Sequence, residues 1–85
     1  MARWQKLLER VLSGQADANI DFDDLCGLLE RLGYRARIRG DHHNYRAPGQ
    51  PAAITIQPRK DGKAKPYQVS QVRSILQARG VTQAP

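Results

Sequence analysis

The pair Gly40-Asp41 stands between two short runs of alternating residue types, and it constrains the fold more than any other stretch of the chain. Glycine readily takes the positive φ that a two-residue turn of type I′ or II′ requires, so the pair predicts a β-hairpin over residues 34–46. A two-residue turn also fixes which residues face each other. The predicted cross-strand pairs are Arg39 with His42, Arg37 with Asn44, and Arg35 with Arg46.

The two faces of this hairpin differ in chemistry, because successive side chains of a strand point to opposite faces. One face, called the arginine face below, carries Arg35, Arg37, Arg39, His42, Asn44 and Arg46, and the other carries Tyr34, Ala36, Ile38, His43, Tyr45 and Ala47. The second set is mostly apolar and suits packing. A charged face is often merely solvated, but like charges opposite each other cost stability, and a surface selected for solubility would mix its signs. We therefore expect the arginine face to bind an anion.

The charge distribution along the chain indicates the same kind of partner. Residues 1–32 contain four Lys or Arg against six Asp or Glu, whereas residues 33–85 contain ten against two. An excess of this kind favours a polyanion, of which nucleic acid is the commonest. The chain has neither a membrane-spanning apolar stretch nor a signal peptide, and its single cysteine, Cys26, is expected in the core, so we expect a cytoplasmic protein.

Two amphipathic helices are predicted before the hairpin. The first covers residues 2–12 within an N-terminal extension of residues 1–14, and its apolar stripe is Trp4, Leu7, Leu8, Val11 and Leu12. This stripe either closes the chain's own core or forms a dimer seam that would make a homo-oligomer. The small core of a chain of 85 residues favours the first role.

The second helix follows a polar connector over residues 15–19. Its apolar stripe is Phe22, Leu25, Cys26, Leu29 and Leu32. Asp21 is the predicted N-cap, Asp24 a weaker partner in a capping box, and Gly33 the left-handed residue at the end. Capping and the helix dipole account for the acidic cluster at Asp21, Asp23 and Asp24, so no metal or cofactor site is expected there.

After the hairpin, residues 53–57 alternate as a third strand that buries Ile54 and Ile56 and ends at Pro58. A basic, flexible loop over residues 59–65 leads to a final helix from Pro66 to Gly80, with its buried stripe at Val69, Val72, Ile75 and Leu76. Residues 81–85 are expected to fray. The elements predict an α+β domain over residues 20–80, with the order α-β-β-β-α, helices on one face of a three-stranded sheet, and the arginine face open.

This arrangement resembles the HicA-type toxins of bacterial type II toxin-antitoxin systems, also called YcfA-like proteins. The resemblance runs from about Phe22 to Gly80 and is most specific in the Gly-x-His-His-x-aromatic motif at residues 40–45. It implies a double-stranded-RNA-binding-like fold, cleavage of mRNA, neutralisation by a HicB-type antitoxin, and a catalytic role for His42. The chain departs from the family in having Asp41 where serine is usual and in the helix that precedes the resemblance.

Cleavage of RNA without a metal needs a base for the 2′-OH proton, positive charge for the phosphorane and an acid for the leaving oxygen. His42 can be the base, with the RNA held by Arg35, Arg37, Arg39, Asn44, Arg46 and the loop residues Lys60, Lys63 and Lys65. His43 points to the other side of its strand, so water or a loop lysine must supply the acid, and we expect a slow ribonuclease. Two alternatives remain open: an RNA-binding module without catalysis, and a domain that mainly binds an acidic antitoxin.

Overall fold

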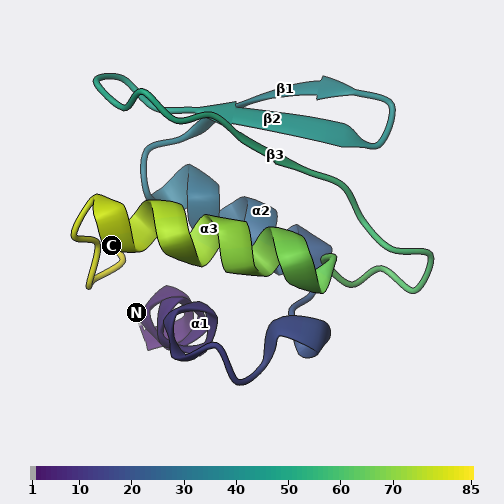
Figure 1. Ribbon diagram of the computed structural model, residues 1–85, viewed down its shortest axis with the longest axis horizontal. Coiled ribbons are helices and arrows are strands. Elements are labelled where there is room, and N and C mark those ends of the chain that lie inside the picture. The colour runs from purple at the N-terminus through teal and green to yellow at the C-terminus, as the bar shows by residue number, and fades with distance from the viewer. Residues whose placement is uncertain (1) are drawn as a thin grey trace.

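The computed structural model describes residues 2–85 and has an α+β fold in three layers (Figure 1). In chain order the elements are α1 (Ala2–Ser13), the 3₁₀-helix η1 (Asp17–Asn19), α2 (Phe22–Arg31), β1 (Arg35–Arg39), β2 (His42–Arg46), β3 (Ile54–Ile56) and α3 (Pro66–Ala78). The sheet is one outer layer, α2 and α3 lie against one of its faces, and α1 packs on the other side of these two helices. The predicted α-β-β-β-α order with an additional N-terminal helix is confirmed.

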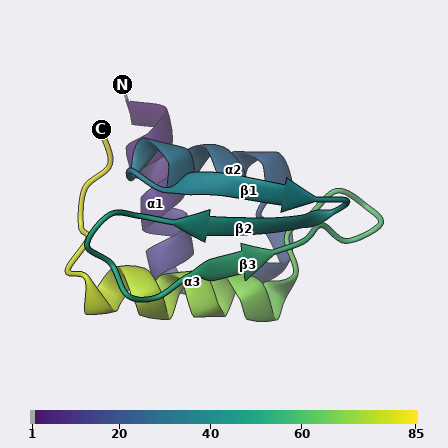
Figure 2. The ribbon, with the colours of Figure 1, turned by 90° about the horizontal axis from the view of Figure 1, so that it is seen from above.

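The sheet is antiparallel in the order β1-β2-β3, so β1 and β3 are its edges (Figure 2). Gly40 has a φ of +58°, which supports the predicted two-residue turn. The register is the predicted one, with Arg35 opposite Arg46 and Arg39 opposite His42. The third strand covers residues 54–56 rather than 53–57, and its two isoleucines are buried as expected.

The main core lies between the sheet and the two helices that cover it. Val69, Val72 and Leu76 of α3 are fully buried, as their spacing predicts. On α2 the buried face is wider than the predicted stripe, because Leu28 is also fully buried. The physical reason is that α2 lies between two layers, with the sheet on one side and α1 on the other (Figure 1).

Helix α1 closes the chain's own core, which is the role that the small size of this core favoured. Leu7, Leu8 and Val11 are buried, and Trp4 and Leu12 pack against them at the edge. The Trp4 indole lies against the backbone of α2 at Gly27, where an added Cβ would overlap the ring. The predicted N-terminal extension begins at residue 1, which lies outside the described residues.

Two features, the connector after α1 and the C-terminal residues, differ from the sequence-based expectations. The connector after α1 contains η1, and Asp17 of this helix accepts two hydrogen bonds from Arg73 of α3, at 2.8 and 3.1 Å. The last residues, expected to fray, have no helix or strand but are held by Gln5, which accepts a hydrogen bond from the Ala84 N–H at 2.8 Å and donates one to the Thr82 carbonyl at 3.2 Å. Both contacts join segments that are far apart in the sequence.

The start of α2 also differs in its capping. Asp21 has the N-cap position and its carbonyl accepts a hydrogen bond from the Leu25 N–H, but its side chain makes no capping hydrogen bond. The carboxylate instead accepts a hydrogen bond of 2.6 Å from Lys63, and Asp24 pairs with Arg3 at 2.9 Å. The prediction of a side-chain cap was wrong because a tertiary partner competes for the same carboxylate.

Candidate nucleic-acid interface

The register brings the six residues of the arginine face to the open side of the sheet. Successive cross-strand pairs place Arg35 with Arg46, Arg37 with Asn44, and Arg39 with His42, all alternating with residues that face the helices. A member that sequence reasoning missed is Thr55 of β3, which pairs with Asn44 and accepts a hydrogen bond of 2.8 Å from its side-chain amide. The alternation of Ile54, Thr55 and Ile56 contained the signal, because it places Thr55 opposite to the buried isoleucines.

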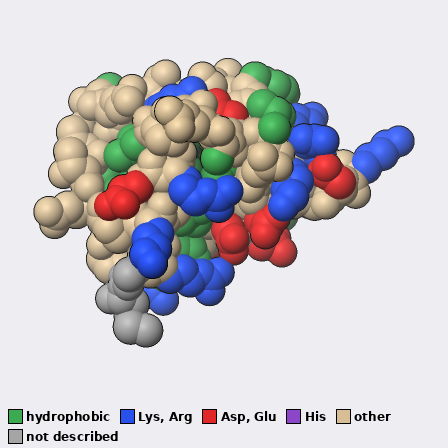
Figure 3. Space-filling view, turned by 90° about the horizontal axis from the view of Figure 1, so that it is seen from below, with side chains coloured by type: hydrophobic (Ala, Val, Ile, Leu, Met, Phe, Trp, Pro, Cys, Tyr) green, Lys and Arg blue, Asp and Glu red, His purple; other side chains and the backbone are tan. Residues whose placement is uncertain are grey.

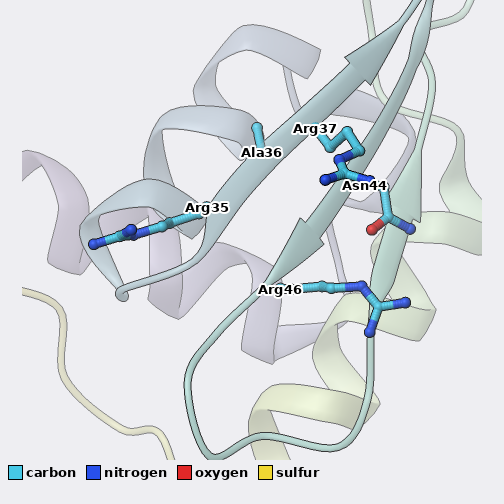
Figure 4. A pocket seen from close by; sticks show the side chains of 5 residues that line it. All are labelled: Arg35, Ala36, Arg37, Asn44 and Arg46. Carbon is cyan, nitrogen blue, oxygen red and sulfur yellow. The ribbon is translucent and has the colours of Figure 1, made fainter.

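Part of this face forms a shallow hollow of about 640 Å³, open to solvent and lined by Arg35, Ala36, Arg37, Asn44 and Arg46. Figure 4 shows Arg37, Asn44 and Arg46 projecting from the same side of the two strands, whereas Arg35 extends away from Arg46. This divergence reduces the repulsion between two like charges that lie opposite each other in the ladder. Neither Arg39 nor His42 lines the hollow; they form the next outward-facing pair, about 7 Å along the strands, at the turn.

Among residues 2–85, no acidic side chain pairs with the arginines of this face. Within residues 2–85, the side chains of Arg35, Arg37, Arg39 and Arg46 make no ion pair and no hydrogen bond to protein. Elsewhere, acidic side chains neutralise basic ones in the pairs Arg3–Asp24, Arg59–Asp61, Lys63–Asp21 and Arg73–Asp17. Figure 3 shows the side of the molecule opposite to the sheet, where Asp or Glu and Lys or Arg lie next to one another. The positive charge of the arginine face is therefore uncompensated, which favours an anionic ligand.

His42 lies at the exposed end of the arginine face. Its side chain is 63% exposed, and its Nε2 lies 3.7 Å from an Asp41 carboxylate oxygen that is equally open to solvent. A pair so exposed and so long is weak, so the imidazole is free to contact a ligand. Asp41 occupies the position at which the resemblance expects serine.

His43 points to the helix side of the sheet. Its ring packs edge-on against Phe22, with centroids 4.9 Å apart, and its Nδ1 lies 3.4 Å from the Tyr45 hydroxyl and 3.8 Å from the Cys26 sulfur. Burial raises the pKa of the Cys26 thiol, and burial also raises the pKa of the Tyr45 phenol, so both groups are neutral near pH 7. The expected orientation of the two histidines to opposite sides is confirmed, and His43 belongs to a packed cluster with Phe22, Tyr45 and Cys26.

Ile38 differs from its predicted environment. By register it shares the helix-facing side with His43, yet it is 57% exposed, and all five residues of β1 are exposed. The expectation that it packs beneath the helices was wrong, because alternation gives the direction of a side chain and not whether an edge strand is covered. β1 makes few contacts with α2 in comparison with its contacts with β2.

The basic loop is more ordered than its composition suggested. The Arg59 N–H donates to the Lys63 carbonyl at 2.8 Å, and the Ala64 N–H donates to the Ile20 carbonyl at 2.8 Å. The ammonium of Lys63 is paired with Asp21, and this hydrogen bond and charge lower the pKa of the Asp21 carboxyl. Figures 1 and 2 show the loop and the β1–β2 turn at the same end of the molecule.

The sequence pattern of one protein family matches this chain. The family is described as the HicA toxin of bacterial toxin-antitoxin systems, and the match covers residues 22–81, well over half of the chain. The chain belongs to the HicA toxin family. It is therefore a toxin of a toxin-antitoxin system, and the family is one of mRNA-cleaving toxins with an antitoxin partner. No curated protein and no solved structure matches the chain.

The match to the HicA family begins at the first residue of α2, so α1 and η1 lie outside it. The arginine face, the loop of residues 59–65 and α3 lie within it. Among the described residues, no helix is long and apolar enough to cross a membrane.

Proposed function

We propose that this HicA-family toxin is a metal-independent mRNA endonuclease of the cytoplasm, with His42 as its catalytic base and the arginine face as its RNA-binding surface. A HicB-type antitoxin neutralises it. The observation that carries the proposal is the uncompensated charge of four arginines on an open sheet face that ends at an exposed imidazole.

The arginines bind the phosphates of the RNA, and Asn44 and Thr55 offer hydrogen-bonding groups beside them. The hollow next to Arg37 and Arg46 has room for one such phosphate group. Lys60 and Lys65, which make no ion pair within the described residues, extend the surface, whereas Lys63 can join it by leaving Asp21. Because phosphate contacts dominate this surface, it holds RNA without reading its sequence.

In the proposed reaction, His42 accepts the proton of a ribose 2′-OH as that oxygen attacks the adjacent phosphorus. The bond from phosphorus to the 5′-oxygen breaks, and the leaving oxygen takes a proton from water or from a loop lysine. The products are a 2′,3′-cyclic phosphate and a 5′-hydroxyl. Arginines next to His42 stabilise the extra negative charge of the phosphorane.

The rate should be modest. His43 is part of the packed cluster with Phe22 and Tyr45, so it is not available as the second acid-base group. One positioned base contributes about 10² to 10⁴ in rate, and no preorganised acid adds to it.

The test is incubation of purified protein with a single-stranded RNA in EDTA, followed by analysis of the fragment ends. We expect cyclic phosphate ends with the wild-type protein, and no cleavage with His42→Ala or with a DNA strand of the same sequence, which lacks the 2′-OH. Cleavage that requires Mg²⁺, or that persists in His42→Ala, would contradict the proposed chemistry.

A second candidate is RNA binding without cleavage. The favouring observation is that Asp41, with its carboxylate 3.7 Å from His42, stands where the family usually has serine. In that case the wild-type protein and His42→Ala would bind RNA alike and neither would produce fragments. The end-group analysis therefore separates the two functions.

A further inference from the structure

The outer edge of β1 is an unused hydrogen-bonding surface. A two-residue turn makes Arg39 and His42 a hydrogen-bonded pair, and such pairs alternate along an antiparallel ladder. The backbone N–H and C=O groups of Ala36 and Ile38 therefore point away from β2, to the free edge of the sheet. Within the described residues, no backbone hydrogen bond beyond the β1–β2 ladder satisfies these groups.

The side chains of β1 give this edge two chemically different sides. Arg35, Arg37 and Arg39 project to the open face and have no ion-pair partner in the part of the chain that the structure describes. Ala36 and Ile38 project to the helix side and are exposed. Ile38 is one of the large apolar side chains that the fold leaves in solvent. A strand that pairs with this edge would thus meet positive charge on one side and apolar surface on the other.

A second copy of this chain fits the edge poorly. If two β1 strands paired with each other, the arginines of one copy would lie against those of the other, and like charges in adjacent strands are destabilising. RNA can neutralise the arginines but cannot form a β-ladder with the backbone or cover Ile38. The complementary occupant is a protein strand that alternates acidic and apolar residues.

We propose that β1 is the docking site for such an acidic strand of the antitoxin, which extends the sheet by one strand. The inference rests on the proposed antitoxin partner and adds the mode of recognition. The main-chain hydrogen bonds of Ala36 and Ile38 provide the pairing, the acidic side chains neutralise the three arginines, and the apolar ones cover Ile38. Because the same arginines bind RNA in the proposed function, the docked strand blocks the RNA site without any conformational change.

The edge of β3, on the other side of the sheet, is the alternative docking site for such a strand. A groove of about 400 Å³ separates β3 from α3, but its lining residues are uncharged: Ala53, Ile54, Thr55, Ser70, Gln71, Ser74 and Ile75. At this edge the outward backbone groups belong to Thr55, since Ile54 and Ile56 pair with β2. An acidic strand has no counter-charge there.

The test uses a capped nine-residue peptide of alternating Glu and Val, with a peptide of the same composition in two blocks as control. We expect the alternating peptide to slow hydrogen exchange of the Ala36 and Ile38 amides in NMR spectra, and the block peptide to have no such effect. A version with N-methyl groups on alternate residues of the pairing edge should not bind. Protection of Thr55 instead of Ala36 and Ile38, or equal binding of the block peptide, would overturn the proposal.

A matched pair of protein variants tests the edge itself. Ile38→Pro removes a backbone N–H that points away from β2, so the β1–β2 ladder stays intact. Edge strands tolerate proline at such a position. Ile38→Pro should lower the affinity for the alternating peptide at least about tenfold, whereas Ile38→Val should bind the peptide as the wild type does. Circular dichroism and retained binding of a 2′-O-methyl RNA establish that the variant is folded. Undiminished peptide binding by folded Ile38→Pro would refute the docking site.

Competition gives a third measurement. At a free peptide concentration ten times its dissociation constant, the apparent dissociation constant for 2′-O-methyl RNA should rise about elevenfold. Simultaneous binding of peptide and RNA would contradict the shared arginines. Because no readout involves cleavage, failure of the His42 chemistry and failure of strand docking are distinguishable.

Discussion

The salt dependence of RNA binding is a direct measure of how many arginines of the open face contact phosphates. Four of them, Arg35, Arg37, Arg39 and Arg46, have no protein counter-charge in the described residues. On a single strand each phosphate contact contributes about −0.7 to the slope of log affinity against log salt, so the four arginines together contribute about −2.8, and contacts from Lys60 and Lys65 add to this. Between about 50 and 200 mM salt the affinity should then fall at least about 50-fold.

Replacing Arg37 by alanine removes one contact. The slope should become less steep by about 0.7, and the loss of affinity over the same range of salt should shrink by a factor of about 2.6. Binding should weaken by a similar factor for every RNA sequence, since a phosphate contact carries no sequence information. Fluorescence anisotropy with labelled 2′-O-methyl RNA measures the affinity without interference from cleavage.

The matched control is Lys6→Ala, which removes the same unit of charge from an exposed position on α1, the helix on the side of the molecule opposite to the sheet (Figure 1). Its slope should equal that of the wild type. An unchanged slope for Arg37→Ala, or an equal change for both variants, would show that binding responds to net charge and not to contacts on the arginine face. A changed preference among RNA sequences would show that Arg37 reads bases.

Three further variants test other parts of the structure. His42→Ala should abolish cleavage and change the free energy of unfolding by at most about 0.5 kcal/mol, whereas His43→Ala should lose about 1 to 3 kcal/mol in thermal melts and lose activity only as it unfolds. Gly27→Ala, although it favours a helix, should destabilise the protein by about 1 to 3 kcal/mol, since the indole of α1 occupies the space of the added methyl group. The hydrogen bond and charge of Lys63 lower the carboxyl pKa of Asp21 below its ordinary value of 3.8. The pair therefore stabilises the fold at pH values above 3.8, and this stabilisation is lost as the pH falls through the lowered pKa of the folded state. Asp21→Asn should accordingly make the free energy of unfolding, measured by urea titration, less dependent on pH on the acid side.

The hairpin was predictable because its determinants are local. Gly40 sets the turn, the turn sets the register, and alternation assigns each side chain to a face. These steps need no knowledge of the rest of the molecule. The same holds for Val69, Val72 and Leu76 in the apolar stripe of α3, although Ile75 is only half-buried, and for the left-handed residue Gly33 at the end of α2, with a φ of +94°.

The ion pairs could not be predicted, because sequence does not show which distant charges meet. Asp17 and Arg73 are 56 positions apart, and Asp21 and Lys63 are 42 apart. The second pair also removed the predicted side-chain cap of α2. For the candidate site the sequence identified the arginines, but their lack of partners is a tertiary property that depends on where every acidic residue lies.

The free toxin therefore keeps a repulsion that its ligands relieve. Arg35 and Arg46 lie opposite each other in the ladder, an arrangement that lowers stability; RNA would neutralise both side chains, and an acidic strand on β1 would neutralise Arg35. If both ligands use the same arginines, their stabilising effects cannot add. Two independent ligands at 100 times their dissociation constants would raise the free energy of unfolding by about 5.4 kcal/mol together, whereas two competing ligands would raise it by about 3.1. Unfolding measured with 2′-O-methyl RNA, with the alternating Glu and Val peptide, and with both distinguishes the two cases, and an additive effect would place the peptide away from the arginine face.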